Sequence, residues 1–308
     1  MSDQTALATP DIQRIKAGQL EIGYLEFGAS DGWPCVLSHG FPYDVHSYTA
    51  VAPQLAEAGA RVIVPWLRGY GPTRFLDAKT LRSGEQAALA ADLLALMDAL
   101  KIDTAVLGGY DWGGRAGCIV AALFPERVSA LITVNGYNLQ NIANCNEPAP
   151  AKEEAAYWYQ YYFHSERGRR GLTANRDDIC RQLWSMWSPD WQFSDATFAQ
   201  SAASFQNSEF VDVVIHSYRH RYALVPGDPA VAHLETRLTA QPNITVPTVI
   251  VDGISDGVHA PSVTSHHKFT GPVSYRQLPA IGHNPPQEDP TAWLACVLEA
   301  RQLSMTEK

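Results

Sequence analysis

An aspartate between two glycines is the strongest chemical signal in the sequence. Asp111 is the centre of the run Gly-Tyr-Asp-Trp-Gly at residues 109–113, directly after a predicted strand and before a predicted helix. Glycines two positions before and after it allow a tight chain reversal, because side chains there would collide. The turn presents Asp111 at a helix N-terminus, where free N–H groups keep a carboxylate ionised. An ordinary helix N-cap is the simpler alternative, but the glycine spacing favours a nucleophile.

A base and its acid partner are expected on two later loops. His283 follows the strand predicted over residues 273–278, and we expect Gly282 to let the backbone turn the imidazole toward the site. Asp256 lies on the loop after the strand predicted over residues 247–252. We therefore predict Asp111 as nucleophile, Asp256 as acid and His283 as base, in that chain order.

Ser255 is a competing nucleophile. It stands in a literal Gly-x-Ser-x-Gly at residues 253–257, which also follows a predicted strand. The only carboxylate between Ser255 and His283 is its neighbour Asp256. Adjacent residues in a tight turn point in different directions, so we reject Ser255.

An oxyanion hole is expected opposite the nucleophile. Residues 38–42 read Ser-His-Gly-Phe-Pro and follow the strand predicted over residues 34–38. We predict that the backbone N–H groups of Phe41 and Trp112 form the hole. The Phe41–Pro42 peptide is expected to be cis, since only proline makes that isomer accessible at small cost. His39 is interpreted as a structural loop residue.

Alternating strands and helices must position these loops. The clearest helical patterns cover residues 84–100 and 290–303, and the short apolar runs between helical stretches are typical of parallel strands with crossover helices. The fold class predicted is α/β, with a mostly parallel sheet flanked by helices. The expected strands cover residues 20–27, 34–38, 61–66, 104–108, 130–135, 247–252 and 273–278.

The segment 139–225 interrupts this alternation with helical patterns alone, at 151–163, 173–187 and 196–222. We interpret it as an inserted helical lid, between a first core part at 1–138 and a second at 226–308. Fifteen of the 31 aromatic rings lie in this segment. An aromatic lid over a carboxylate nucleophile is therefore expected.

Composition excludes several functions. The formal net charge of −9 argues against partners such as nucleic acid or an anionic membrane surface. No run of eighteen apolar residues and no basic start followed by an apolar stretch occurs, so we expect a cytoplasmic protein without a membrane span. The five cysteines are scattered without a C-x-x-C spacing, which argues against disulfides and a zinc site. A homodimer is left open.

These motifs, in this order, resemble the α/β-hydrolase superfamily over residues 20–303. Within it, the runs His-Gly-Phe-Pro at 39–42, Leu-Arg-Gly-Tyr-Gly at 67–71 and Tyr-Asp-Trp-Gly-Gly at 110–114 resemble the epoxide hydrolases and their dehalogenase relatives. Family members often have histidine before the nucleophile, where this chain has Tyr110, and we expect that departure to alter packing rather than chemistry. The resemblance implies an enzyme without a metal or organic cofactor.

An aspartate nucleophile narrows the reaction. Its attack on an ester would give an anhydride, whereas attack on an epoxide or a carbon–halogen bond gives an ordinary ester. Water activated by His283 then hydrolyses that ester, while Asp256 holds the imidazole. We expect a hydrolase that converts a small apolar epoxide to a vicinal diol. Hydrolysis of an organohalide by the same nucleophile is the alternative.

The resemblance implies two lid tyrosines as proton donors to the opened epoxide. Tyr159 and Gln160, with Phe163 after them, resemble the first tyrosine motif of the epoxide hydrolases, and Tyr218 with Arg219 resembles the second. The remaining lid tyrosines are expected to pack the lid: Tyr157, Tyr161, Tyr162 and Tyr222.

Arg115 supports the dehalogenase alternative. In fluoroacetate dehalogenases, arginines directly after the nucleophile and four positions after it hold the substrate carboxylate; Arg115 matches the second, and Trp112 replaces the first. Their acid lies on the earlier strand, where this chain has Asn135.

A third hypothesis is a lidded binding protein without catalysis. The side chains expected to bind substrate are Trp112, Phe41, Arg115 and Gln160.

Overall fold

A mixed sheet of nine strands forms the centre of the part of the chain that the structure describes, residues 10–305 of a computed structural model. The strand order is β1-β2-β4-β3-β6-β7-β8-β9, and β5 pairs with β2. The pairs from β4 to β9 along this order are parallel, while β1, β4 and β5 are antiparallel to β2. The strands are β1 Gln13–Ala17, β2 Leu20–Phe27, β3 Trp33–Ser38, β4 Ala60–Pro65, β5 Arg74–Phe75, β6 Ala105–Gly109, β7 Val128–Val134, β8 Thr248–Gly253 and β9 Val273–Leu278.

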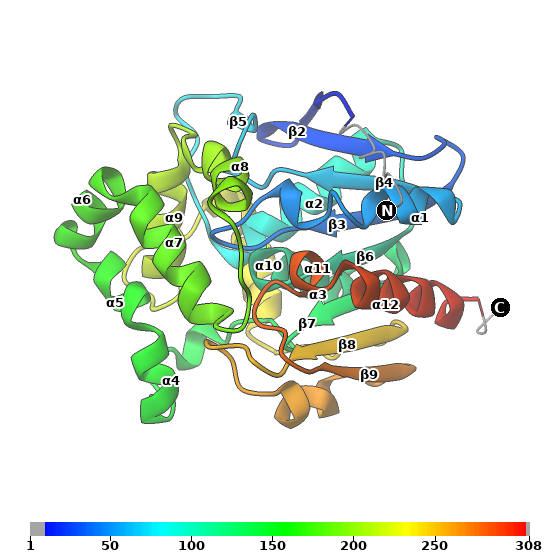
Figure 1. Cartoon of the computed structure of the whole chain (residues 1–308). Helices are drawn as coiled ribbons and strands as arrows, with labels where there is room; N and C mark the ends of the chain where they lie inside the picture. Colours follow the sequence, from blue (N-terminus) through cyan, green and yellow to red (C-terminus); the bar gives the residue numbers. More distant parts are fainter. Residues whose placement is uncertain (1–9, 306–308) are drawn as a thin grey trace.

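Helices cover both faces of the sheet, as Figure 1 shows. Helix α2 (Gln86–Ala99) packs between α3 (Asp111–Leu123) and α10 (Ala232–Leu238), and α3 lies against β6 and β7. On the other face α1 (Ala52–Glu57) and α12 (Pro290–Leu303) pack against the sheet and each other. Both faces of the central strands are thus covered, which explains why β6 and β8 are buried at every residue and are largely apolar in sequence.

A helical layer is inserted between β7 and β8 and covers one end of the sheet, drawn in green to yellow-green in Figure 1. Its helices are α4 Ala151–Ala156, α5 Trp158–His164, α6 Glu166–Ala174, α7 Arg176–Trp187, α8 Asp195–Phe205 and α9 Phe210–His220. A short helix, α11 Pro285–Glu288, precedes α12, and 3-10 turns lie at Val45–Ser47, Pro125–Arg127, Ile142–Asn144, Pro229–Val231 and Ser262–Lys268.

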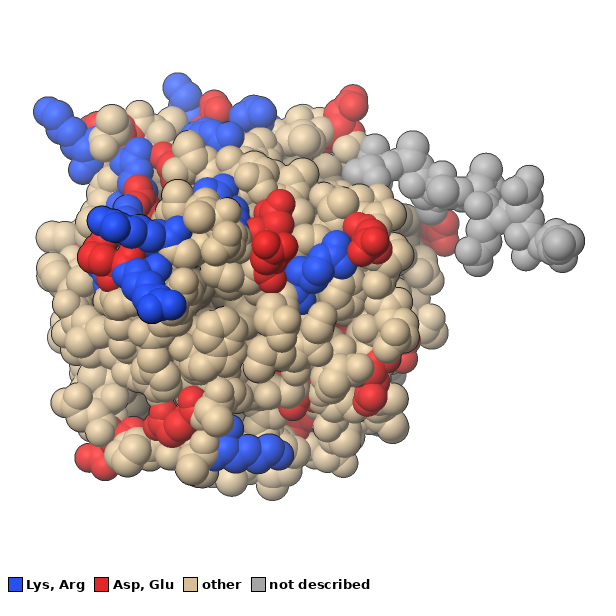
Figure 2. All heavy atoms as spheres, turned by 60° about the vertical axis from the view of Figure 1, so that its left-hand side comes forward, with Lys and Arg blue, Asp and Glu red and all other residues tan. Residues whose placement is uncertain are grey.

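The face turned toward the viewer in Figure 2 is largely uncharged in its middle, and its charged side chains gather mainly in the upper part. Many charged side chains of the inserted helices form ion pairs, as Arg219 does with Glu166 and Arg181 with Asp195. Among the helices of residues 10–305, none is both long and apolar enough to cross a bilayer.

The predicted fold class is confirmed, and the predicted strands agree with those observed to within two residues at each end. The strands β1 and β5 were not predicted. The first four residues of the edge strand β1 are not buried, so its sequence carries little apolar alternation, and β5 has only two residues.

The lid helices are more divided than predicted. The helix expected over residues 151–163 is interrupted at Tyr157, which separates α4 from α5. The helix expected at 173–187 is α7, and α6 before it was not predicted; the Ser165 side chain accepts from the Gly168 N–H and caps α6.

Candidate active site

Asp111 lies in the sharp turn between β6 and α3, with a φ of 48°. A Cβ on Gly109 would lie 2.6 Å from the backbone of Gly113, and a Cβ on Gly113 would lie 2.0 Å from the Ser38 carbonyl oxygen. Both glycines are therefore required by close backbone approach, as their spacing predicts. The strained φ of a non-glycine residue at this turn is typical of functional sites.

The Asp111 carboxylate is held by the backbone of the loop opposite. Its Oδ1 accepts a hydrogen bond of 2.7 Å from the Phe41 N–H, and the side chain is 7% exposed. Burial favours the neutral acid, but His283, Arg115 and the Phe41 N–H outweigh it and hold the pKa of Asp111 well below its usual range. Asp111 is thus an ionised carboxylate with one oxygen fixed and the other, Oδ2, turned toward His283.

The Phe41 N–H is one of the two donors predicted for the oxyanion hole, and in the structure it binds the Asp111 carboxylate. The Phe41–Pro42 peptide is cis, as predicted. The Trp112 ring is buried and stacks on Phe41 with ring centroids 5.7 Å apart. The role of the Trp112 backbone N–H as the second donor of the oxyanion hole remains a prediction.

His283 and Asp256 form a buried pair at the ends of the strands β9 and β8. The imidazole Nδ1 lies 2.9 Å from Asp256 Oδ2, and because a carboxylate only accepts, Nδ1 carries the hydrogen. Asp256 also accepts from the Asn135 side-chain amide at 2.8 Å and from the N–H groups of Val258 and His259. These donors fix the carboxylate, which in turn fixes the imidazole tautomer.

The Nε2 atom of His283 faces Asp111 at 3.9 Å, too long for a direct hydrogen bond. Burial opposes protonation of His283, but the carboxylates of Asp256 and Asp111 outweigh it and raise its pKa. The imidazole is therefore stabilised as a cation while both carboxylates are charged.

Gly282 has a different role from the one predicted. No unusual φ occurs at this residue, whereas a Cβ there would lie 2.5 Å from the Ser188 Cα. The Ser188 hydroxyl accepts from the His283 N–H at 3.0 Å. Gly282 thus allows the lid segment to approach and hold the backbone of the base.

Ser255 is placed away from the nucleophile, in agreement with its rejection. Its hydroxyl donates to Asp190, and its N–H donates to the Ile281 carbonyl at 2.9 Å. Tyr110, the departure from the family pattern, is fully buried and hydrogen bonded to Ser47 at 2.7 Å. His39 is buried, and its Nε2 accepts from the Leu67 N–H at 3.2 Å.

Tyr159 and Tyr218, from the inserted helices α5 and α9, pack near the Phe41 ring, and the Phe41 N–H binds Asp111. Both are buried, with exposed fractions of 3% and 0%, and their ring centroids lie 5.2 Å apart. The ring centroid of Phe41 lies 6.2 Å from that of Tyr159 and 5.3 Å from that of Tyr218. Burial is the main cause that raises the pKa of both phenols, so both keep their protons at neutral pH. Within residues 10–305 the Tyr218 hydroxyl has no hydrogen-bond partner.

Gln160 and Arg115 lie beside this pair. The Gln160 amide nitrogen donates to the Tyr159 hydroxyl at 3.0 Å. Arg115 is 6% exposed and donates through Nε to the Asn138 carbonyl at 3.2 Å. Burial, followed by the charge of Arg221, lowers the pKa of Arg115 to about 10, which leaves it cationic at neutral pH.

Sequence reasoning missed Arg221, and it did not predict the contacts of Asn135 with Asp256 or of Tyr222 with Gln160. Arg221 Nη1 and the Tyr222 hydroxyl both donate to the Gln160 amide oxygen, so Tyr222 does more than pack. Arg221 follows Tyr218 by three residues at the end of α9, and side chains so spaced share a helix face. That spacing was the available signal.

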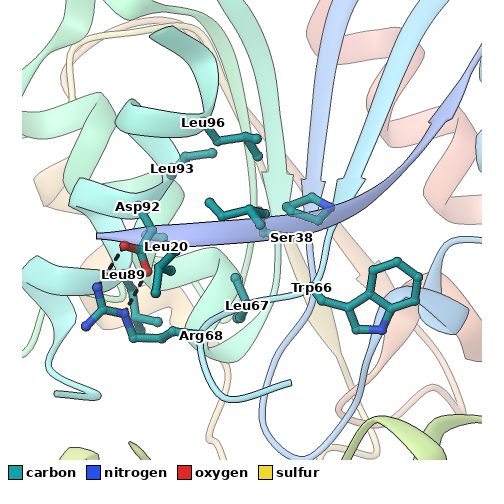
Figure 3. A pocket seen from close by; sticks show the side chains of 12 residues that line it. Leu20, Ser38, Trp66, Leu67, Arg68, Leu89, Asp92, Leu93 and Leu96 are labelled. Atoms are coloured by element: carbon teal, nitrogen blue, oxygen red, sulfur yellow. Dashed lines mark hydrogen bonds and ion pairs between the residues drawn. The ribbon is translucent and has the colours of Figure 1, made fainter. Parts of the chain in front are cut away.

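A small cavity lies between α2 and the sheet, bordered by residues of β2 and the end of β4 (Figure 3). Its volume is about 20 Å³, enough for roughly one water molecule. The Arg68–Asp92 ion pair borders it, whereas Asp111, Asp256 and His283 do not. This cavity is therefore too small and wrongly placed to hold the substrate.

One group in residues 10–305 has the composition of a metal site, namely Glu85, His220 and Glu235. The side chains already have partners in the chain: His220 pairs with Glu85 at 3.0 Å, and Glu235 accepts from the Gln86 amide and the Ala87 N–H. The cluster lies outside the site described above.

Comparisons with known proteins agree with the motifs. A family model described as "alpha/beta hydrolase fold" matches residues 34–284. A crystal structure from Klebsiella pneumoniae, provisionally described as an epoxide hydrolase, is 48% identical with a TM-score of 0.95 and covers 97% of this chain and 100% of that chain.

Curated relatives match over shorter stretches. Bifunctional epoxide hydrolase 2 of Sus scrofa is 30% identical over 149 residues, which are 48% of this chain and 26% of that protein. A haloalkane dehalogenase of Mycobacterium marinum is 33% identical over 131 residues, 41% of this chain and 42% of that protein. The chain thus spans less than half the length of these two relatives.

Both groups that the motifs resemble are therefore found among the similar proteins, and the resemblance is confirmed. The family model covers most of the chain. The chain belongs to the alpha/beta hydrolase fold family.

Proposed function

We propose that the protein hydrolyses an apolar epoxide to a vicinal diol through an ester on Asp111. The observation that carries this proposal is the placement of two protonated phenols, Tyr159 and Tyr218, next to an ionised carboxylate nucleophile. An epoxide needs both: a nucleophile at carbon and an acid at oxygen.

In the first step Asp111 Oδ2 attacks an epoxide carbon and the carbon–oxygen bond breaks. The released oxygen takes a proton from Tyr159 or Tyr218, which becomes a phenolate. Oδ1, held by the Phe41 N–H, becomes the carbonyl oxygen of the ester. The surrounding rings of Phe41 and Trp112 exclude water from this step.

In the second step His283 takes a proton from water and the hydroxide attacks the Asp111 carboxyl carbon. Alkylation has removed the charge of Asp111, one of the carboxylates that raise the pKa of His283, so the imidazole becomes a better-poised base only after the ester forms. Asp256 stabilises the imidazolium that results. The oxyanion collapses and expels the alkoxide, which takes the proton of the new carboxylic acid, so that Asp111 is again a carboxylate and the diol leaves. The proton on His283 returns through solvent to the phenolate.

Residues 139–225 would act as the lid that closes this site, with cores at 1–138 and 226–308. The contacts that support this division are those between the lid and the loop after β3, opposite the nucleophile: the Trp184 indole donates to the Pro42 carbonyl at 2.7 Å, and Tyr218 packs on Phe41.

The test is to incubate the protein with aryl and alkyl epoxides, haloalkanes and haloacetates, and to follow diol and halide separately. We expect diol from at least one epoxide class. Halide release without diol from any epoxide would overturn the assignment, and a lidded binding protein would release neither.

Haloacid hydrolysis is the second candidate, and Arg115 favours it. Among the described residues its guanidinium donates only through Nε, although it is almost entirely buried near Asp111. Its two Nη groups could hold a substrate carboxylate. If this candidate is right, Arg115→Met should lower kcat/KM for a haloacetate roughly 100-fold and that for an uncharged epoxide less than threefold.

A further inference from the structure

We propose that Arg221 is a positioning residue: it orients the Gln160 amide so that Tyr159 accepts from Gln160 and turns its own hydroxyl hydrogen toward the nucleophile. This inference rests on the proposed function, since it explains how one of the two phenols is prepared to donate its proton.

Gln160 is 2% exposed, and three side chains contact its amide. Its oxygen accepts from Arg221 Nη1 at 3.2 Å and from the Tyr222 hydroxyl at 3.1 Å. Its nitrogen lies 3.0 Å from the Tyr159 hydroxyl. Both ends of the amide are therefore engaged inside the protein.

Arg221 permits only one orientation of the Gln160 amide. A guanidinium has donors and no acceptor, so the atom that faces it must be the oxygen. A tyrosine hydroxyl donates or accepts, so Tyr222 and Tyr159 would tolerate either orientation. The arginine alone thus decides that the NH₂ group of Gln160 faces Tyr159.

The orientation of the Gln160 amide determines where the hydroxyl hydrogen of Tyr159 points. Because the NH₂ group can only donate, Tyr159 must accept from it, and the single hydroxyl hydrogen points away from Gln160. Tyr218 and Asp111 are among the groups that face Tyr159, so this hydrogen can point toward them, where the epoxide oxygen would lie in the proposed reaction. If the amide were reversed, its oxygen would capture this hydrogen instead.

The charges around Tyr159 act in the same direction. The groups that face it are Asp111 and Arg115 from α3, and Tyr218 and Arg221 from α9 and its end. Arg221 also lies 4.8 Å from the centre of the Tyr218 ring. Burial raises the pKa of Tyr159 and Arg221 lowers it, so the arginine also stabilises the phenolate that forms when the proton leaves.

The kinetic test measures ring opening in a single turnover with excess enzyme. Arg221→Met should slow it roughly 10- to 100-fold with substrate affinity nearly unchanged, because the amide is free to reverse. Gln160→Glu should slow it at least as much, since a carboxylate can only accept and captures the Tyr159 hydrogen. Tyr222→Phe should slow it less than fivefold, because Arg221 still fixes the amide.

The matched control is Arg219→Met, on the same helix. Arg219 pairs with Glu166 and donates to the Phe163 carbonyl, outside the Gln160 contacts. Equal ring-opening rates in Arg221→Met and Arg219→Met, or an unimpaired Gln160→Glu, would overturn the proposal.

A second measurement is independent of turnover. With 3,5-difluorotyrosine at position 159, fluorine NMR follows ionisation of that phenol directly. We expect Arg221→Met to increase its proton affinity roughly tenfold and Arg219→Met to leave it unchanged. No difference between the two variants overturns the positioning role even where epoxides are opened. If the unmodified protein opens no epoxide, the proposed function fails, and this titration still decides the role of Arg221.

Discussion

The two regions that make up the active site are built in different ways. The core region, Asp111, Asp256 and His283, stands on turns that leave strand ends, and Asp111 and Asp256 are held by backbone N–H groups. The lid region, centred on Tyr159 and Tyr218, stands on helices, and its hydroxyls and amides contact other side chains.

This difference assigns the two regions different parts of the reaction. Backbone donors make the core less dependent on other side chains, although Asn135 also binds Asp256 and Ser188 binds the His283 N–H. In the proposed reaction the core would form and hydrolyse the ester, and the lid side chains would supply the proton to the leaving group. Variants in the two regions should therefore fail at different steps.

Loss of the nucleophile should have the largest effect. Asp111→Asn removes the attacking oxygen while its amide still fills the same space, and we expect turnover of every substrate class to fall at least roughly 10⁴-fold. Diol or halide release measures it, with Asp98→Asn, at an exposed ion pair with Arg127, as the control. A fully active Asp111→Ala protein would return Ser255 or another site to consideration.

Loss of the base should separate the two steps. His283→Gln leaves Asp111 free to attack but no group to activate water, so we expect one equivalent of substrate to bind covalently and steady-state turnover to fall roughly 10³-fold. Mass spectrometry of the intact protein detects the adduct. His267→Gln, at an exposed residue, should show neither effect. Absence of an adduct with full loss of turnover would mean that His283 acts before the ester forms.

Loss of both lid phenols should affect only substrates that need a proton. The double variant Tyr159→Phe with Tyr218→Phe keeps the buried rings, and we expect ring opening of epoxides to slow roughly 10²- to 10⁴-fold. Halide release from an organohalide should change much less, because a halide leaves without a proton. Tyr161→Phe, at a ring 38% exposed, is the control. An unchanged epoxide rate would mean that the protons come from elsewhere.

The same contrast explains what could be predicted from the sequence. The position of Asp111 follows from local spacing, since glycines at 109 and 113 are needed wherever a strand turns this sharply into a helix. Asp256 and His283 follow from their places after strands. These are short-range signals, and the structure brings the three residues together.

The contacts of the lid residues could not be predicted from short-range sequence spacing. Arg221 meets Gln160 across 61 residues, and Asn135 meets Asp256 across 121. Such pairs depend on how helices pack on the core. The spacing of Arg221 from Tyr218 predicts a shared helix face, but no local spacing connects Arg221 with Gln160 or Asn135 with Asp256. Gly282 was misinterpreted for the same reason, because the segment that approaches it, at Ser188, is distant in sequence.

The smallest expected effect concerns stability rather than rate, and it should distinguish the regions by pH. The raised pKa of His283 contributes stability that is full below the unfolded-state value of about 6.5 and is lost as pH rises through the folded-state value. The lowered pKa of Asp256 contributes stability present above about 3.9 and lost as pH falls. Both contributions are therefore present together between about pH 4 and 6.5.

Asp256→Asn should lower the free energy of unfolding by roughly 1–3 kcal/mol in that window, and by less near pH 9. Urea unfolding at pH 5.5 and 9 measures the difference, with Asp98→Asn as a control that should show little change at either pH. A destabilisation that grows from pH 5.5 to 9 would contradict the assigned charges. Tyr159→Phe should show no such pH dependence, because the raised pKa of that phenol keeps it neutral throughout. In that case the free energy of unfolding would depend on the protonation of the core residues, whereas it would not depend on the protonation of the lid phenol.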